Sequence, residues 1–185
     1  EDVLQDAISS SHPYGAVTIP KLADAAGLMH TNPKMVWVPD DPALGIYRKD
    51  LANNVFLYEE RPAGNRDDVA SFAHSEKIVN TAKTIEKTQE EHDHKVDQNM
   101  VVRARLFDIL LGDWDRHDDQ WRWATFKEND VTIYRPVPRD RDQVYYVSEG
   151  LALRIVSMDF LMPKFQGFDF RIRNVNGFSY NARHF

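Results

Sequence analysis

The chain has 185 residues, a formal net charge of −6, and 42% hydrophobic and 11% aromatic residues. This length and apolar content favour one packed domain over a disordered chain, and the negative charge argues against a general nucleic-acid-binding role. There are no cysteines, which excludes disulfides and thiolate metal sites. No apolar run approaches the length of a membrane-spanning helix, and the first residues do not form a signal peptide.

The first third of the chain is predicted to contain helical segments and two short strands. Residues 1–12 are expected to form a short polar helix or tail, and apolar spacing predicts a helix over Ile19–Ala26 that ends at Gly27. Apolar runs at 35–38 and 55–58, each followed by turn residues, predict the strands.

The middle of the chain is predicted to be helical. The segment Asp67–Glu91 is charged, with a thin apolar stripe, and is expected to form a helix. His92 and His94 follow it two positions apart, so they would not share a helix face and are interpreted as surface residues rather than a metal-binding pair. Asp97 is the expected N-cap of a second helix, and Gly112 is expected to end that helix.

A charged loop and a β-hairpin follow the second helix. Residues 113–119 include four aspartates, one arginine and one histidine, and tryptophans flank them. Alternation over 121–126 and the return at 131–134, separated by a Lys-Glu-Asn-Asp turn, predict the hairpin. Strand character is expected again at 144–147, and the tail over 151–185 is expected to add a short apolar helix and an aromatic-rich cover.

The charged loop resembles the catalytic loop of atypical kinases. It reads Asp115-Arg116-His117 with Gln120 five positions after the aspartate, where phosphoinositide-type lipid kinases have D-R-H-x-x-N and Fam20-type secreted kinases have D-R-H-x-x-E. A P-x-D-x-D segment at 138–142 is similar to the one that follows the loop in CotH-type spore-coat kinases.

The resemblance implies an α+β fold, namely a kinase-like C-terminal lobe with its core at about residues 55–160. This lobe would be mostly helical, with a small antiparallel hairpin near the loop. The implied activity is phosphotransfer, with Asp115 accepting the proton of the acceptor hydroxyl or orienting it. His117 would brace the loop by hydrogen bonds, and Arg116 would brace it by pairing with a nearby carboxylate.

The resemblance also implies a site for Mg²⁺ or Mn²⁺ with ATP. Gln120 would supply an amide oxygen, and either Asp140 or Asp142 would be the metal-binding aspartate, since the P-x-D-x-D spacing does not decide between them. The exit of the second strand corresponds to the linker between kinase lobes, whose backbone binds adenine. Glu59 and Glu60 are therefore candidate nucleotide-binding residues.

Two features of active kinases are missing from the sequence. It contains no G-x-G-x-x-G phosphate loop, and Lys34 and Lys49 lie in turn-like surroundings rather than in a strand followed by a helix glutamate. The phosphotransferase is therefore expected to be degenerate, or to have a shortened or absent N-terminal lobe.

Other functions stay open on the same residues. The acidic loop could form a structural network of ion pairs with nearby arginines, or it could bind a structural Ca²⁺ ion. A metal-dependent hydrolase would hold its ion with Asp113, Asp115, His117 and Asp119. A non-catalytic interaction domain would use the tryptophans beside the loop as a binding surface.

Further short segments resemble parts of large uncharacterised bacterial envelope proteins. They include H-P-Y-G-A at 12–16, E-E-R-P at 59–62 and N-A-R-H-F at 181–185. In those proteins such a segment lies upstream of an outer-membrane barrel-type region. The resemblance implies a single periplasmic or cell-surface domain over 1–185, cut from a larger protein, which would also explain a start without Met.

Overall fold

The computed structural model describes residues 12–146, and these form an α+β domain, as the sequence predicted. The described α-helices are α2 (Gly15–Ala25), α3 (Arg48–Leu51), α4 (Thr81–Glu90) and α5 (Gln98–Leu111). The strands are β1 (Lys34–Val38), β2 (Asn54–Tyr58), β3 (Ile78–Asn80), β4 (His94–Val96), β5 (Trp121–Glu128) and β6 (Val131–Pro138). The polar segment expected at 1–12 falls almost wholly outside the described residues, and the tail expected over 151–185 falls entirely outside them.

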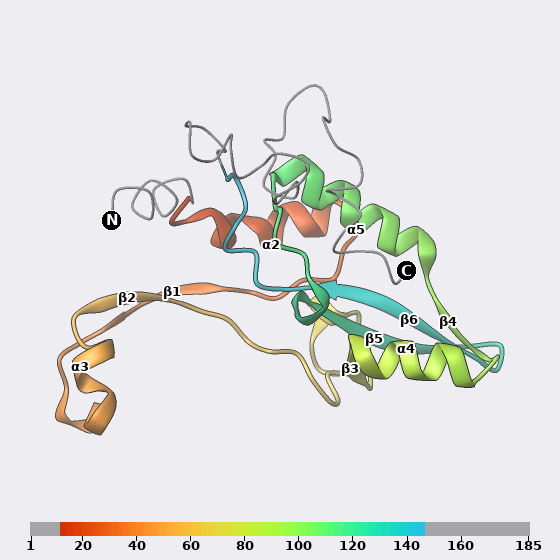
Figure 1. The fold of residues 1–185 in the computed structure, drawn as a ribbon, viewed down its shortest axis with the longest axis horizontal. Coiled ribbons are helices and arrows are strands. Elements are labelled where there is room, and N and C mark those ends of the chain that lie inside the picture. Colours follow the sequence, from red (N-terminus) through yellow and green to blue (C-terminus); the bar gives the residue numbers. More distant parts are fainter. Residues whose placement is uncertain (1–11, 147–185) are drawn as a thin grey trace, which may run out of the picture.

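A four-stranded sheet in the order β3-β5-β6-β4 forms the centre of the fold (Figure 1). The β5–β6 hairpin is confirmed, and its turn residues Asn129 and Asp130 have φ angles of 48° and 67°. Two consecutive left-handed residues are typical of the tight hairpin turn whose twist matches that of the strands. β3 pairs antiparallel with β5, and β4 pairs parallel with β6.

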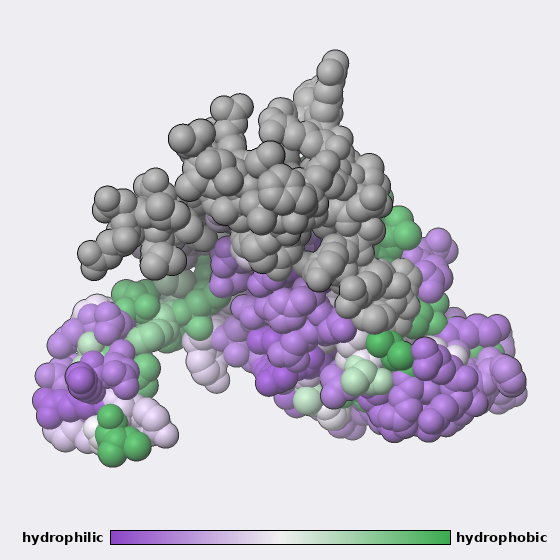
Figure 2. All heavy atoms as spheres, viewed as in Figure 1, coloured by the Kyte–Doolittle hydropathy of each residue, from purple (hydrophilic) through white to green (hydrophobic). Residues whose placement is uncertain are grey.

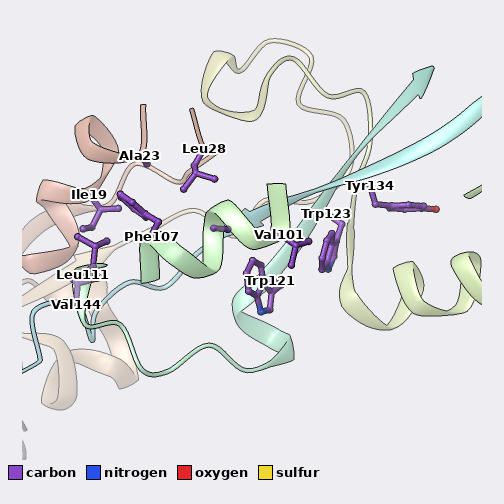
Figure 3. Packing of buried hydrophobic residues seen from close by; sticks show 11 residues of the cluster. Ile19, Ala23, Leu28, Val101, Phe107, Leu111, Trp121, Trp123, Tyr134 and Val144 are labelled. Atoms are coloured by element: carbon purple, nitrogen blue, oxygen red, sulfur yellow. The ribbon is translucent and has the colours of Figure 1, made fainter. Parts of the chain in front are cut away.

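Both faces of the sheet are covered by apolar side chains. On one face the stacked rings of Trp121 and Trp123 pack with residues of α2 and α5, including Phe107 and Leu111 (Figure 3). On the other face Ala124 of β5 packs in a second buried cluster with residues of the segment between β2 and β3. The alternation that predicted the hairpin thus separates two clusters, one on each side of the sheet.

The ends of α5 are the ones that the sequence indicates. The Asp97 side chain accepts a hydrogen bond from the Met100 N–H at 3.1 Å, which satisfies one of the free donors of the first helical turn. Gly112 adopts a left-handed conformation with φ 68°, which a residue without Cβ adopts at little cost. The chain then reverses directly into the charged loop.

Strands β1 and β2 form a separate antiparallel pair that extends away from the sheet as an arm, with α3 near its tip (Figure 1). Several apolar side chains of this arm are exposed, and Figure 2 shows hydrophobic surface along it. The exposed ones are Trp37, Ile46, Tyr47, Val55 and Tyr58.

Three predictions of local structure are wrong. Within Asp67–Glu91 only Thr81–Glu90 is α-helical, because the Asn80 side chain caps the helix by accepting from the Lys83 N–H and the preceding residues form turns and β3. The strand expected at 144–147 is a turn in its described part, with Tyr145 at φ 60°. The domain also contains more sheet than the expected mostly helical lobe with a single hairpin.

No helix in the described range 12–146 combines the length and the apolar character that a membrane crossing requires.

Candidate functional site

A buried cluster of charges lies directly under the loop that resembles a kinase catalytic loop. Arg116 is fully buried. Its Nε donates to Asp108 Oδ2 at 3.2 Å, and its Nη2 donates to Asp113 Oδ2. Arg141, which follows β6, donates to Asp108 Oδ1 at 2.6 Å and to Asp113 Oδ2 at 3.1 Å. The cluster therefore joins the end of α5, the loop and the segment after β6.

Hydrogen bonds to the backbone hold the two loops side by side. The guanidinium of Arg116 donates to the Arg139 carbonyl at 2.7 Å, and the Arg139 N–H donates to the Gln120 carbonyl at 3.0 Å. A buried arginine that satisfies both carboxylates and carbonyls fixes the relative position of these segments. The bracing role predicted for Arg116 thus has a geometric basis.

Burial and the neighbouring arginines shift the pKa values of Asp108 and Asp113 in opposite directions. Complete burial tends to raise the pKa of Asp108, but Arg116, Arg141 and Arg105 together lower it below the ordinary value. Burial raises the pKa of Asp113 to about 6, against the opposing attraction of Arg116. The two carboxylates share Arg116 and Arg141. Asp108, which also accepts from Arg105, therefore favours the ionised form more strongly than Asp113 does.

Asp115 and Asp140, two further carboxylates of the two loops, affect the ionisation of Asp142 together with its burial. The pKa of Asp142 is raised first by burial, then by the negative charge of Asp140, and also by that of Asp115. Such repulsion requires the groups to be near one another. The ligand oxygens of these three aspartates do not form a group within 4.8 Å of one another in the described residues, so a bound cation would have to draw them together.

Gln120, the predicted amide ligand, is buried beside the Arg139 backbone, and its side-chain oxygen has no hydrogen bond in the described residues. Its side chain is 94% buried, since only 6% of the residue is exposed, and its Oε1 accepts no hydrogen bond from the part of the chain that the structure describes. Buried amide oxygens nearly always have a partner.

Glu59 lies against the second loop, where its carboxylate binds the backbone. Its two carboxylate oxygens each accept from the Asp140 N–H at 3.1 Å, and the Thr31 hydroxyl donates to the same carboxylate. Burial raises the pKa of Glu59, although these hydrogen bonds and the nearby Arg139 act in the opposite direction. Glu60, its predicted companion, is half-buried.

Asp140 has a left-handed backbone with φ 55°, a conformation that is uncommon for a residue with a side chain. The bonds from its N–H to Glu59 help to hold it there. The result is a carboxylate that is about one-third exposed, with 37% of its side chain accessible. Glu59 is therefore a positioning residue for Asp140.

The four residues of the hydrolase alternative are not brought together. Asp113 lies in the buried charge cluster, and Asp119 pairs with Arg122 at 3.2 Å and with Arg61 at 3.0 Å. The His117 ring accepts from the Asp119 N–H at 3.3 Å, and its other nitrogen lies 3.9 Å from Asp115. The arginines take the carboxylates that a shared metal would need, so this arrangement and a structural Ca²⁺ site in the same turn lose support.

The sequence did not indicate Asp108 as a member of this region. Asp108 is a fully buried charged residue near the end of α5, and nothing in its local pattern distinguishes it from a solvent-facing helix residue. Glu59 was singled out, but for another role. The available signal was an arginine among the aspartates of the loop, which indicates a network of ion pairs.

Comparison of the chain with family models, with curated proteins and with solved structures found no match.

Asp142→Asn is expected to stabilise the fold at neutral pH. The pKa of Asp142 is higher in the folded chain than its ordinary value of 3.8, so the folded state binds the proton more tightly. Stability then falls as the pH rises between these two values, and the ionised carboxylate destabilises the fold above them. Thermal melts should show a gain of a few degrees at pH 7 that shrinks towards pH about 4.

Asp119→Asn is the matched control for this substitution. The hydrogen bond from Arg122 lowers the pKa of Asp119, so its ionised form is favoured by folding and its loss should have the opposite sign. Equal responses of the two variants would contradict the placement of Asp142 among like charges.

Proposed function

We propose that this domain binds a divalent cation of the Mg²⁺ class together with a nucleotide, as a degenerate or incomplete kinase-like phosphotransferase. The observation that carries the proposal is that hydrogen bonds of Arg116 and Arg139 to the backbone hold the loop that bears Asp115 beside the segment that bears Asp142. Burial and the nearby negative charges raise the pKa of Asp142 in that segment. Ionised carboxylates held near one another without a cation are destabilising, and Mg²⁺ prefers such oxygen ligands.

The buried Oε1 of Gln120 supports the same proposal. An amide oxygen without a hydrogen-bond partner in the described residues is a suitable ligand for a hard cation. In this role Asp115 orients an acceptor hydroxyl, Asp142 and Gln120 contact the metal, and Asp140 completes the acidic edge. The phosphates of the nucleotide and water would fill the remaining coordination positions.

Arg116 has a positioning role in this proposal. Its guanidinium is fully buried and bonded to Asp108, Asp113 and the Arg139 carbonyl, so it does not face a phosphate. It holds the loop that carries Asp115 against the segment that carries Asp140. His117 lies half-exposed beside Asp115, where it can contact an incoming substrate.

A thermal-shift titration with ATP and Mg²⁺ tests the proposal. The chain is expected to melt at a higher temperature when both are present than with either alone, because a ligand that binds only the folded state stabilises it. Asp142→Ala should abolish the shift. Asp130→Gly, a substitution in the hairpin turn outside the site that removes a carboxylate without straining the left-handed backbone, is the matched control and should retain it.

The possible outcomes separate the proposal from its rivals. A shift that needs both ligands and disappears in Asp142→Ala supports it. An equal shift with Ca²⁺ alone contradicts it in favour of a structural ion, and the absence of any shift with Mg²⁺, Mn²⁺ and ATP contradicts nucleotide binding.

The arm favours a second candidate, a non-catalytic interaction domain of a larger envelope protein. Trp37 and Ile46 expose 59% and 85% of their surface, and clustered exposed apolar residues commonly mark protein contacts. In this function the arm binds another protein segment and the acidic loops serve as structure. Loss of partner binding in Trp37→Ser, together with no response to nucleotide, would favour this candidate.

A further inference from the structure

A second group of side chains that could bind a metal ion lies outside the acidic loops, at the turn between α4 and β4. Glu91, Asp93 and His94 each offer a ligand atom, and these atoms lie within 4.8 Å of one another. The His94 Nε2 is 2.9 Å from Glu91 Oε2. Imidazole nitrogen and carboxylate oxygen are ligands that Zn²⁺ and related ions accept.

The orientation of His94 is fixed by its other ring nitrogen. Nδ1 lies 2.7 Å from the hydroxyl of Tyr134, a residue that is 3% exposed and belongs to the main core. Without a metal, Nε2 pairs with the Glu91 carboxylate; with a metal between them, Nδ1 would carry the proton and donate it to the Tyr134 hydroxyl, and Nε2 would bind the ion. Metal-binding histidines commonly have such a partner on the second nitrogen, which sets the ring's direction and basicity.

A buried hydroxyl without a hydrogen bond in the described residues lies on the strand next to His94. In the parallel register of β4 and β6, Thr132 lies directly opposite His94, so their side chains project from the same face of the sheet. Thr132 is 6% exposed, and its Oγ1 makes no hydrogen bond with any of residues 12–146. A water molecule bound to a metal at His94 would supply the partner that this hydroxyl lacks.

The backbone holds the remaining ligand in position. The Thr132 N–H donates to the Asp93 carbonyl at 2.7 Å, and the His94 N–H donates to the Glu91 carbonyl at 3.1 Å. The three ligand residues therefore belong to one tight turn that is tied to β6. A pocket of about 410 Å³ opens beside His94, with Ile85 and Thr88 of α4 in its lining.

We infer that Glu91, Asp93 and His94 form a binding site for a divalent transition metal ion of the Zn²⁺ type, separate from the acidic loops. His94 binds through Nε2 and the two acids bind through carboxylate oxygens, which leaves one position of a tetrahedral ion for water or another ligand. Lys87 pairs with Glu91, so its ammonium competes with the metal for this carboxylate. The inference does not depend on the proposed phosphotransferase function.

Titration calorimetry with Zn²⁺ on the whole chain tests the inference, with absorption spectroscopy of the Co²⁺-loaded chain as a second measurement. One ion is expected to bind at this turn, and Co²⁺ should give the visible absorption of a tetrahedral site. His94→Ala should lower the affinity by at least about tenfold, and Tyr134→Phe by about 10–100-fold through the lost second contact. Lys87→Met should increase the affinity.

His92→Ala is the matched control. His92 is the exposed neighbour of the ligands and lies outside the group, so its loss should leave Zn²⁺ affinity and the Co²⁺ spectrum unchanged. If His94→Ala disturbs folding, Glu91→Gln at the exposed helix end tests the same ligand set. Equal affinity of the parent chain, His94→Ala and Glu91→Gln, or no Zn²⁺ binding by the parent chain, would overturn the inference.

Discussion

Arg116→Ala is expected to lower the free energy of unfolding by about 3–5 kcal/mol. The substitution removes a fully buried guanidinium and leaves Asp108 and Asp113 with fewer donors in the interior. A buried carboxylate that loses its partner must either remain charged at a high cost or take up a proton. It also removes the hydrogen bond to the Arg139 carbonyl. Urea unfolding followed by circular dichroism measures the change.

Arg61→Ala is the control for this experiment. Arg61 pairs with Asp119 on the surface, with 63% of its side chain exposed, and exposed pairs contribute at most about 1 kcal/mol. A comparable loss in both variants would contradict the view that Arg116 is the buried centre of the site. Because Arg116 also positions Asp115, its variant should lose the Mg²⁺–ATP response even under conditions where it remains folded.

Trp123→Ala should be similarly destabilising, by about 3–5 kcal/mol, because it creates a large cavity between the sheet and its helices. The Trp123 ring is 0% exposed, stacks on Trp121, and its Nε1 donates to the Thr81 hydroxyl at 3.0 Å. The change therefore combines lost apolar burial with a buried hydroxyl deprived of a donor. Circular dichroism suits the measurement, since tryptophan fluorescence itself changes.

Trp37→Ala is the control, because it makes the same Trp-to-Ala change at an exposed position. The Trp37 side chain lies on the arm and is 59% exposed, so its truncation should change the free energy of unfolding by about 0.5 kcal/mol or less. A large effect at Trp37 together with a small one at Trp123 would mean that the arm, and not the sheet, holds the domain together.

The parts of the fold that the sequence predicted correctly are those with local signals. Helix α5 has a side-chain cap at Asp97 and a left-handed glycine at its end, and both act within one turn of the helix. The hairpin has alternating residues on both strands and a two-residue turn. Capping and turn chemistry depend on a few neighbouring residues, and so they can be recognised without knowledge of the rest of the chain.

The missed elements depend on distant partners. β3 and β4 have three residues each, which is too short for a period to be recognised, and they become strands only because β5 and β6 offer edges to them. The hairpin return was predicted only over 131–134, but β6 continues to Pro138 and includes the prolines at 136 and 138. Both prolines lie beyond the 132–134 stretch that pairs with β4, where no donor to that neighbour is needed.

The candidate site was predicted in outline but not in detail. The motif around Asp115 and the P-x-D-x-D segment lie in two loops that hydrogen bonds of Arg116 and Arg139 hold side by side, while the roles assigned to their carboxylates stay predictions. The buried partners of Arg116 and the contact between Glu59 and Asp140 involve residues separated by up to 81 positions. No local pattern in the sequence records such a pairing.

The left-handed backbone of Asp140 has a consequence for the choice of variants. Alanine at this position would remove the carboxylate and would also keep a Cβ in a conformation that disfavours one, so a loss of ligand response would have two causes. Glycine adopts the same conformation without strain and retains the N–H that Glu59 accepts. Asp140→Gly is therefore the cleaner way to ask whether the carboxylate itself is needed, because it deletes the charge and spares the shape of the loop.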